Sequence, residues 1–228
     1  MSVALDVNTD GGSFSNVTSV SFSHAGGSPD YLLVRVSCLD GSALTISATY
    51  DSASMTSVST FQFTTQEGTD KSYSAIFEKK SPSSGTKTVA ITLSSGSYGA
   101  CGSQSYTGVD QTTSTGTPVT ASNTTGTTHT HTVSSTTGNL VADSIFIYNA
   151  LGTSDMVPNQ TLRFRGLGYI ALYYGGAAQD ADGTGSVDMT WTWTPNGGYG
   201  HIAVEIKAAA AGAGFPFQQN LMQHILVR

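Results

Sequence analysis

The stretch YLLVRVSC (31–38) decides the fold class of this chain. Every second residue of it would share one face of an extended strand: Leu32, Val34, Val36 and Cys38. Successive side chains of a β-strand point to opposite faces, so this alternation predicts a strand with one buried and one wet face. Four further stretches alternate in the same way: ALTISATY (43–50), TKTVAITLS (86–94), SVDMTWTW (186–193) and YGHIAVEIK (199–207).

The last two stretches give the clearest assignment of inner and outer side chains. In SVDMTWTW both Trp191 and Trp193 fall on the apolar side, so we expect them in the core. In YGHIAVEIK the inner residues are Ile202, Val204 and Ile206. The outer residues, which we expect to face water, are His201, Glu205 and Lys207.

Composition supports an all-β chain. The 228 residues include 31 Ser, 32 Thr and 26 Gly, and only 11% of the residues are charged. Hydroxyl and glycine residues suit strands and turns better than helices. We therefore predict an antiparallel two-sheet sandwich of jelly-roll type over residues 1–207, followed by a C-terminal extension at 208–228.

Charge and hydropathy exclude several functions. The net charge is −6 and no basic stripe occurs, which argues against a nucleic-acid partner. No run of 18 apolar residues is present, so no membrane-spanning segment is expected. The start, MSVALDVNTDGGSF (1–14), lacks the basic and apolar regions of a signal peptide, so we expect synthesis and folding in a cytosol unless a signal has been removed.

Several segments follow one another in the order of a known family: YLLVRVSCLDG (31–41), SYTGVDQTTSTGT (105–117), TGNLVADSI (137–145), SVDMTWTWTP (186–195) and GHIAVEIKAA (200–209). In these segments the chain resembles a broad family of jelly-roll or concanavalin-like β-sandwich domains. Such domains occur in bacterial surface proteins and in bacteriophage structural proteins. The resemblance implies a role in binding or structure and carries over no catalytic residues.

The C-terminal extension has a different pattern. A spacer of Ala and Gly (208–214) precedes an apolar arm, whose side chains we expect to bind a partner: Phe215, Phe217, Leu221, Met222, Ile225 and Leu226. From Phe217 onward these residues fall on one face of a helix, although HILVR (224–228) also fits a strand. The arm could cover its own sandwich or another subunit. The spacer, which reaches about 20 Å when extended, favours another subunit.

Two groups of residues have the spacing of metal ligands. His129 and His131 would point to one side of a strand and could begin a zinc site, but no third ligand lies nearby in the sequence. We predict two exposed histidines, on one of two solvated edge strands within 111–137, although a disordered linker would also fit that stretch. Asp180 and Asp182 resemble the start of a calcium loop, but Trp191 stands where an EF-hand has Glu, so an acidic turn is preferred. No metal or other cofactor is predicted.

Other chemistry is weakly indicated. Cys38 and Cys101 lack metal-site spacing and are predicted to be buried thiols. Glu205 beside His201 is the best acid pair on offer, but a solvated strand face explains it better, so an enzyme is not expected. Three tyrosines could form a sugar-binding platform at a loop or sheet rim: Tyr169, Tyr173 and Tyr174.

These observations favour a bacteriophage virion structural protein, of the capsid decoration or cement type. It would be made in the host cytoplasm, form a homo-oligomer and contact other virion proteins through its arm. The alternative is a carbohydrate-binding attachment module, in a tail fibre or surface adhesin, that uses the tyrosines. A concanavalin-like glycan-cleaving enzyme ranks last, because its carboxylate pair is not evident.

Overall fold

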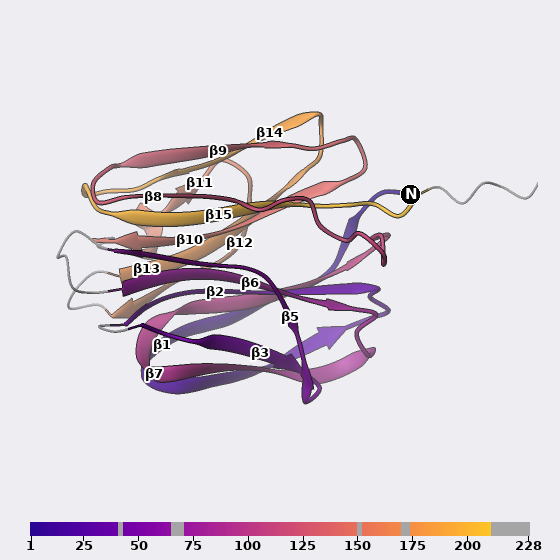
Figure 1. The fold of residues 1–228 in the computed structure, drawn as a ribbon, viewed down its shortest axis with the longest axis horizontal. Coiled ribbons are helices and arrows are strands. Elements are labelled where there is room, and N and C mark those ends of the chain that lie inside the picture. The colour runs from indigo at the N-terminus through magenta and orange to yellow at the C-terminus, as the bar shows by residue number, and fades with distance from the viewer. Residues whose placement is uncertain (41–42, 65–70, 150–151, 170–173, 211–228) are drawn as a thin grey trace, which may run out of the picture.

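The computed structural model describes residues 1–40, 43–64, 71–149, 152–169 and 174–210. The strands are antiparallel and form three sheets, stacked in layers (Figure 1). The all-β prediction is therefore confirmed, whereas the described residues form three sheets where two were expected. Among these residues no helix is long and apolar enough to cross a membrane, and one 3-10 turn, η1 (Thr153–Asp155), is present.

The largest sheet has seven strands. In spatial order they are β4 (Ala53–Ser54), β3 (Ile46–Tyr50), β7 (Gly85–Thr107), β2 (Tyr31–Asp40), β6 (Lys71–Lys80) and β5 (Thr56–Thr64), with β1 (Ala4–Gly26) also paired to β7. The two other sheets are smaller. The five-stranded sheet has the order β12 (Thr161–Tyr169), β13 (Tyr174–Asp182), β10 (Leu140–Tyr148), β15 (Tyr199–Ile206) and β8 (Val119–Asn123). The three-stranded sheet has the order β11 (Val157–Pro158), β14 (Ser186–Thr192) and β9 (Thr128–Ser134).

Two 23-residue strands, β1 and β7, give the seven-stranded sheet its curl. The first half of β7 pairs with β3 and the second half with β2, while β1 follows β7 from end to end. The ladder between β1 and β7 shifts register between Phe14 and Ser19, and such bulges bend a strand. The sheet therefore wraps around one hydrophobic cluster.

The interior of this curled sheet confirms the alternation in the sequence. All four predicted inner residues of β2 are fully buried there, beside the predicted inner residues of β3 and β7: Leu32, Val34, Val36, Cys38, Ile46, Ala48, Val89, Ile91 and Leu93. Cys38 and Cys101 are buried in the same cluster as free thiols, as predicted. Burial raises the pKa of the Cys101 thiol to about 12, so the thiol stays protonated.

The predicted wet face of the central strands is wrong. β2, β10 and β13 are buried along nearly their whole length. One face of β2 packs inside its own curled sheet and the other against the five-stranded sheet, whereas β10 and β13 lie between the two other sheets. On β15, Ile202, Val204 and Ile206 pack toward the seven-stranded sheet as expected. His201, which was expected to face water, is fully buried under the three-stranded sheet, and Ala203 packs in the cluster on that side.

The Thr-rich stretch 111–137 contains two strands at sheet edges, as predicted. β8 is the edge of the five-stranded sheet and β9 the edge of the three-stranded sheet. The turn between them includes Gly126, which has a φ of 156°. The chain therefore crosses from the five-stranded to the three-stranded sheet at this turn, and β9 packs against β15.

The interface between the two larger sheets should dominate stability. Leu33 is fully buried there, whereas Leu5 is 37% exposed. We expect Leu33→Ala to lower the free energy of unfolding by about 2–5 kcal/mol, since the change leaves a cavity. Leu5→Ala, the matched control, should lower it by less than about 1 kcal/mol. Urea unfolding of both variants measures the difference, and equal losses would contradict this layering.

Candidate functional site

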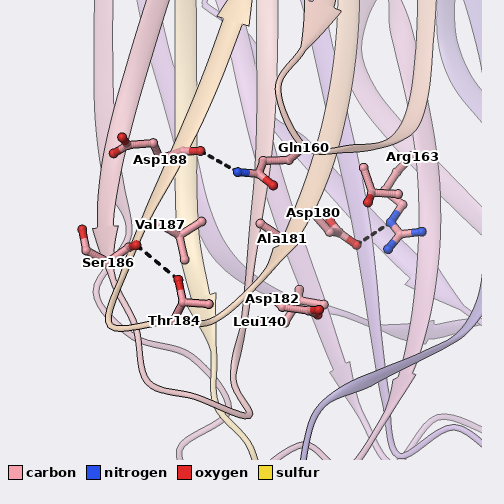
Figure 2. Close-up of a pocket in the computed structure, with 11 residues that line it drawn as sticks. Leu140, Gln160, Arg163, Asp180, Ala181, Asp182, Thr184, Ser186, Val187 and Asp188 are labelled. Atoms are coloured by element: carbon pink, nitrogen blue, oxygen red, sulfur yellow. Dashed lines mark hydrogen bonds and ion pairs between the residues drawn. The ribbon is translucent and has the colours of Figure 1, made fainter.

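A polar groove lies where β13 passes into β14, and Figure 2 shows its lining. Its volume is about 360 Å³. The residues that line it come from β10, β12, β13, β14 and the adjoining turns: Leu140, Gln160, Thr161, Arg163, Asp180, Ala181, Asp182, Thr184, Ser186, Val187 and Asp188. Most of these side chains can donate or accept hydrogen bonds, so the groove suits a polar ligand.

The groove exists because β13 and β14 belong to different sheets. The turn between them, with Gly185 at φ 91°, carries the chain from the five-stranded to the three-stranded layer. Gln160 holds the two layers together at this point. Its backbone N–H donates to Gln179 Oε1 at 2.9 Å, and its side-chain Nε2 donates to the carbonyl of Asp188 at 3.0 Å (Figure 2).

A buried ion network forms one wall of the groove. Asp180 is 1% exposed, and its Oδ1 lies 2.6 Å from Nη1 of Arg35, which reaches across from β2 in the seven-stranded sheet. Its Oδ2 lies 2.7 Å from Nε of Arg163 (Figure 2) and accepts a hydrogen bond of 2.5 Å from the hydroxyl of Tyr106. Arg35 also donates to Gln104 Oε1 at 2.9 Å. A buried carboxylate requires compensation of this kind.

These contacts answer the question that Asp180 and Asp182 raised in the sequence. Asp182 is exposed at the groove, but both oxygens of Asp180 are bound to guanidinium groups. A cation placed at Asp180 would meet Arg35 and Arg163. Asp180 therefore belongs to a salt-bridge network and Asp182 lines the polar groove, and the spacing of the two residues could not reveal the two arginines.

A second polar group lies between the five-stranded and three-stranded sheets, at β9 and β15. It contains three histidines, His129, His131 and His201, each of which offers one ring nitrogen within 4.8 Å of the others. Among the described residues this is the one group of three or more His, Cys, Asp or Glu side chains with metal-site spacing. The prediction of two exposed histidines is wrong, because His131 is only 8% exposed. Sequence alternation placed His201 on the outer face of its strand and did not connect it with this group, because it lies 70 residues away from His131.

Asp143 on β10 organises the surroundings of the histidines. Its Oδ2 accepts hydrogen bonds from Trp191 Nε1 at 2.7 Å and Gln179 Nε2 at 2.9 Å, and it lies 2.9 Å from His201 Nε2. Its Oδ1 accepts from the Gln179 backbone N–H at 2.8 Å. Asp143 is fully buried, so these donors replace the water that the carboxylate has lost.

The remaining predicted residues are widely separated. Trp191 and Trp193 are in the core, at 0% and 2% exposure, which confirms the prediction. Glu205 accepts a hydrogen bond from Asn139 Nδ2 at 2.7 Å, whereas His201 contacts Asp143, so the two do not form an acid pair.

The predicted sugar platform is described only in part. Tyr174 is 1% exposed, with its ring 5.3 Å from that of Tyr148 and 6.0 Å from that of Phe146, and so it does not present a surface to solvent. The side chain of Tyr169 and the whole of Tyr173 lie outside the described residues. So do all the predicted partner-binding residues of the arm: Phe215, Phe217, Leu221, Met222, Ile225 and Leu226.

The ion network predicts a large effect of charge removal. Asp180→Asn keeps the shape of the side chain but leaves Arg35 and Arg163 without a counter-charge. We expect the free energy of unfolding to fall by about 3–5 kcal/mol. Asp188→Asn changes an exposed carboxylate on the same groove, which accepts one hydrogen bond from Thr132 at 2.7 Å, and should lower it by about 1 kcal/mol or less. Denaturant unfolding of both variants tests this, and comparable losses would show that the network is not stabilising.

Comparison of the chain with protein families, with curated proteins and with solved structures finds no match. The resemblance to β-sandwich domains of bacterial surface and bacteriophage proteins therefore stays an expectation, carried by the segments quoted above. What the chain does has to be inferred from its own residues.

Proposed function

We propose that this chain is a bacteriophage virion structural protein, whose β body is a building block and whose C-terminal arm binds neighbouring subunits. The observation that carries the proposal is how the chain leaves the body. After β15, the backbone N–H of Ala208 donates to Asn139 Oδ1 and that of Ala209 to the carbonyl of Gly108, both at 2.8 Å. The first residues of the spacer are thus fixed to the body, and the arm that follows the spacer has an apolar sequence of the kind that requires a partner surface.

The construction of the body also suits a structural part. The two larger sheets are joined by buried polar contacts as well as apolar ones: Arg35 with Asp180, Ser37 with Ser144 at 2.9 Å, and Ser74 with the carbonyl of Gly200 at 3.0 Å. Such satisfied contacts fix one arrangement of the layers. A surface with few charges, within a chain of 11% charged residues, suits close packing of many copies. We expect a homo-oligomer of the decoration or cement type.

Removal of the arm tests this function. We expect the full chain to sediment as an oligomer, and the chain truncated after Ala210 to sediment as a monomer with the same circular dichroism spectrum. A full-length variant with Phe217→Ser, Leu221→Ser and Ile225→Ser is the matched control, because it keeps the length of the arm and removes its apolar face. It should also be monomeric. An unchanged oligomer after truncation, or a monomeric full chain, would contradict the proposal.

A second candidate function is recognition of a glycan, and the polar groove favours it. The groove presents carboxylate, amide and hydroxyl groups, which are the groups that hydrogen-bond sugar hydroxyls. In this alternative the groove, rather than the buried Tyr174, would hold the ligand. The chain would then be an attachment module of a tail fibre or a surface protein.

A glycan array separates this alternative from the first. If the groove binds a glycan, Asp182→Ala should weaken binding about tenfold or more, because a hydrogen bond to a charged group is lost. Asp51→Ala, an exposed carboxylate on β3's turn, is the control and should bind as the wild type does. Absence of any glycan signal, or an equal signal from both variants, would exclude the groove as a glycan site.

A further inference from the structure

The three histidines between β9 and β15 have the arrangement of a metal site. Their ring centroids are 4.6–5.4 Å apart, and one nitrogen from each ring lies within 4.8 Å of the others. They come from two sheets, since β9 belongs to the three-stranded layer and β15 to the five-stranded layer (Figure 1). We propose that His129, His131 and His201 bind one divalent transition-metal ion, with Zn²⁺ the ion that suits them best.

The hydrogen bonds of each ring leave one nitrogen available. His201 Nε2 lies 2.9 Å from the Asp143 carboxylate, and His131 Nε2 lies 3.2 Å from the His201 carbonyl. Both partners are acceptors, so each neutral ring carries its hydrogen on Nε2 and its lone pair on Nδ1. His129 uses Nδ1 for the Tyr199 hydroxyl at 2.8 Å, which leaves Nε2.

Two of these nitrogens are buried without a partner among the described residues: His129 Nε2 and His201 Nδ1. A buried polar atom with no hydrogen bond is unfavourable, and most such atoms in proteins are satisfied. A metal ion would satisfy both atoms at once. No hydrogen bond between the rings satisfies these two nitrogens, and the stacking of His129 on Tyr199, with ring centroids 4.5 Å apart, does not supply one.

The protonation states also suit a metal. The pKa values of His129 and His131 are both lowered to about 4. The main cause is burial, and the second is the nearby ring of His201. Both rings are therefore neutral at pH 7, and neutral imidazole is the form that ligates metals. The carboxylate of Asp143 behind His201 completes the pattern of a carboxylate that orients a ligating histidine. Asp143 is itself held by Trp191 and Gln179.

The geometry requires a small closure. Zn–N bonds of 2.0–2.1 Å in a tetrahedral site place the nitrogens about 3.4 Å apart, so ring nitrogens that now lie up to 4.8 Å apart must approach to that distance. β9 is an edge strand of the smallest sheet and is the element best able to move. Three protein ligands leave a fourth position, which a water ligand would fill. The ion would then link the three-stranded layer to the five-stranded layer.

Isosteric variants separate ligation from structure. His129→Asn keeps an amide near the Tyr199 hydroxyl. His131→Gln keeps a donor for the His201 carbonyl, and His201→Gln keeps a donor for the Asp143 carboxylate. Each removes the free nitrogen. His24→Asn is the matched control, because His24 is also buried with an unpartnered Nε2 but belongs to no group of metal-ligand spacing among the described residues; its Nδ1 contacts Thr9 and Ser103 on β1 and β7 at 3.0 and 2.8 Å.

The experiment is titration of untagged, EDTA-treated full-length chain with Zn²⁺ by calorimetry, and with Co²⁺ by visible absorption. We expect one ion per chain and a tetrahedral Co²⁺ spectrum. The melting temperature should rise by roughly 5–10 °C when Zn²⁺ exceeds its Kd a hundredfold. Each cluster variant should bind at least tenfold more weakly, and His24→Asn should bind normally. No binding by the wild type, or undiminished binding by all three cluster variants, would overturn the proposal.

Discussion

The two central strands of the five-stranded sheet, β10 and β13, are covered on both faces, and this constraint determines how the rest of the molecule is built. A buried polar side chain on these strands must find its partners within the protein, because it cannot reach water. On the side of the seven-stranded sheet, Asp180 meets Arg35 and Arg163. On the side of the three-stranded sheet, Asp143 meets Trp191 and His201. Each buried carboxylate thus joins two layers, and contacts between layers are directional as well as apolar.

The two carboxylates differ in what compensates them. Asp180 is paired with two arginines, so a further cation at this wall of the groove would be repelled by their positive charges. The carboxylate of Asp143 accepts hydrogen bonds from the neutral donors Trp191 and Gln179 and faces the ring of His201. The first arrangement favours a fixed scaffold, and the second can accommodate a metal ion next to it. This difference explains why Asp182, in spite of its spacing from Asp180, is a weaker metal candidate than three histidines from two sheets.

Sequence alternation predicted the strands and their inner faces well, as Val34 on β2 and Ile202 on β15 show. It failed for the opposite faces. Arg35 and His201 are polar and therefore read as solvent-facing, but both are fully buried, since a polar side chain with partners from another sheet has the same pattern as a hydrated one. The third histidine and the arginines of Asp180 were equally hidden, because contacts between layers join residues far apart in the chain. The groove arises where the chain passes from the five-stranded to the three-stranded sheet between β13 and β14, and no local sequence pattern predicts that passage.

The pairing of β1 with β7 has a consequence for how the chain is made. Ala4 lies opposite Thr107 and Gly26 opposite Gly85, so the first strand cannot begin its pairing with β7 until residue 85 has left the ribosome, or complete it before residue 107 has. Pairing over such separations is slow, and a long strand that waits with open edges can be captured by the same strand of another nascent copy. Synthesis of many copies on one message would make this exchange a direct competitor of correct folding.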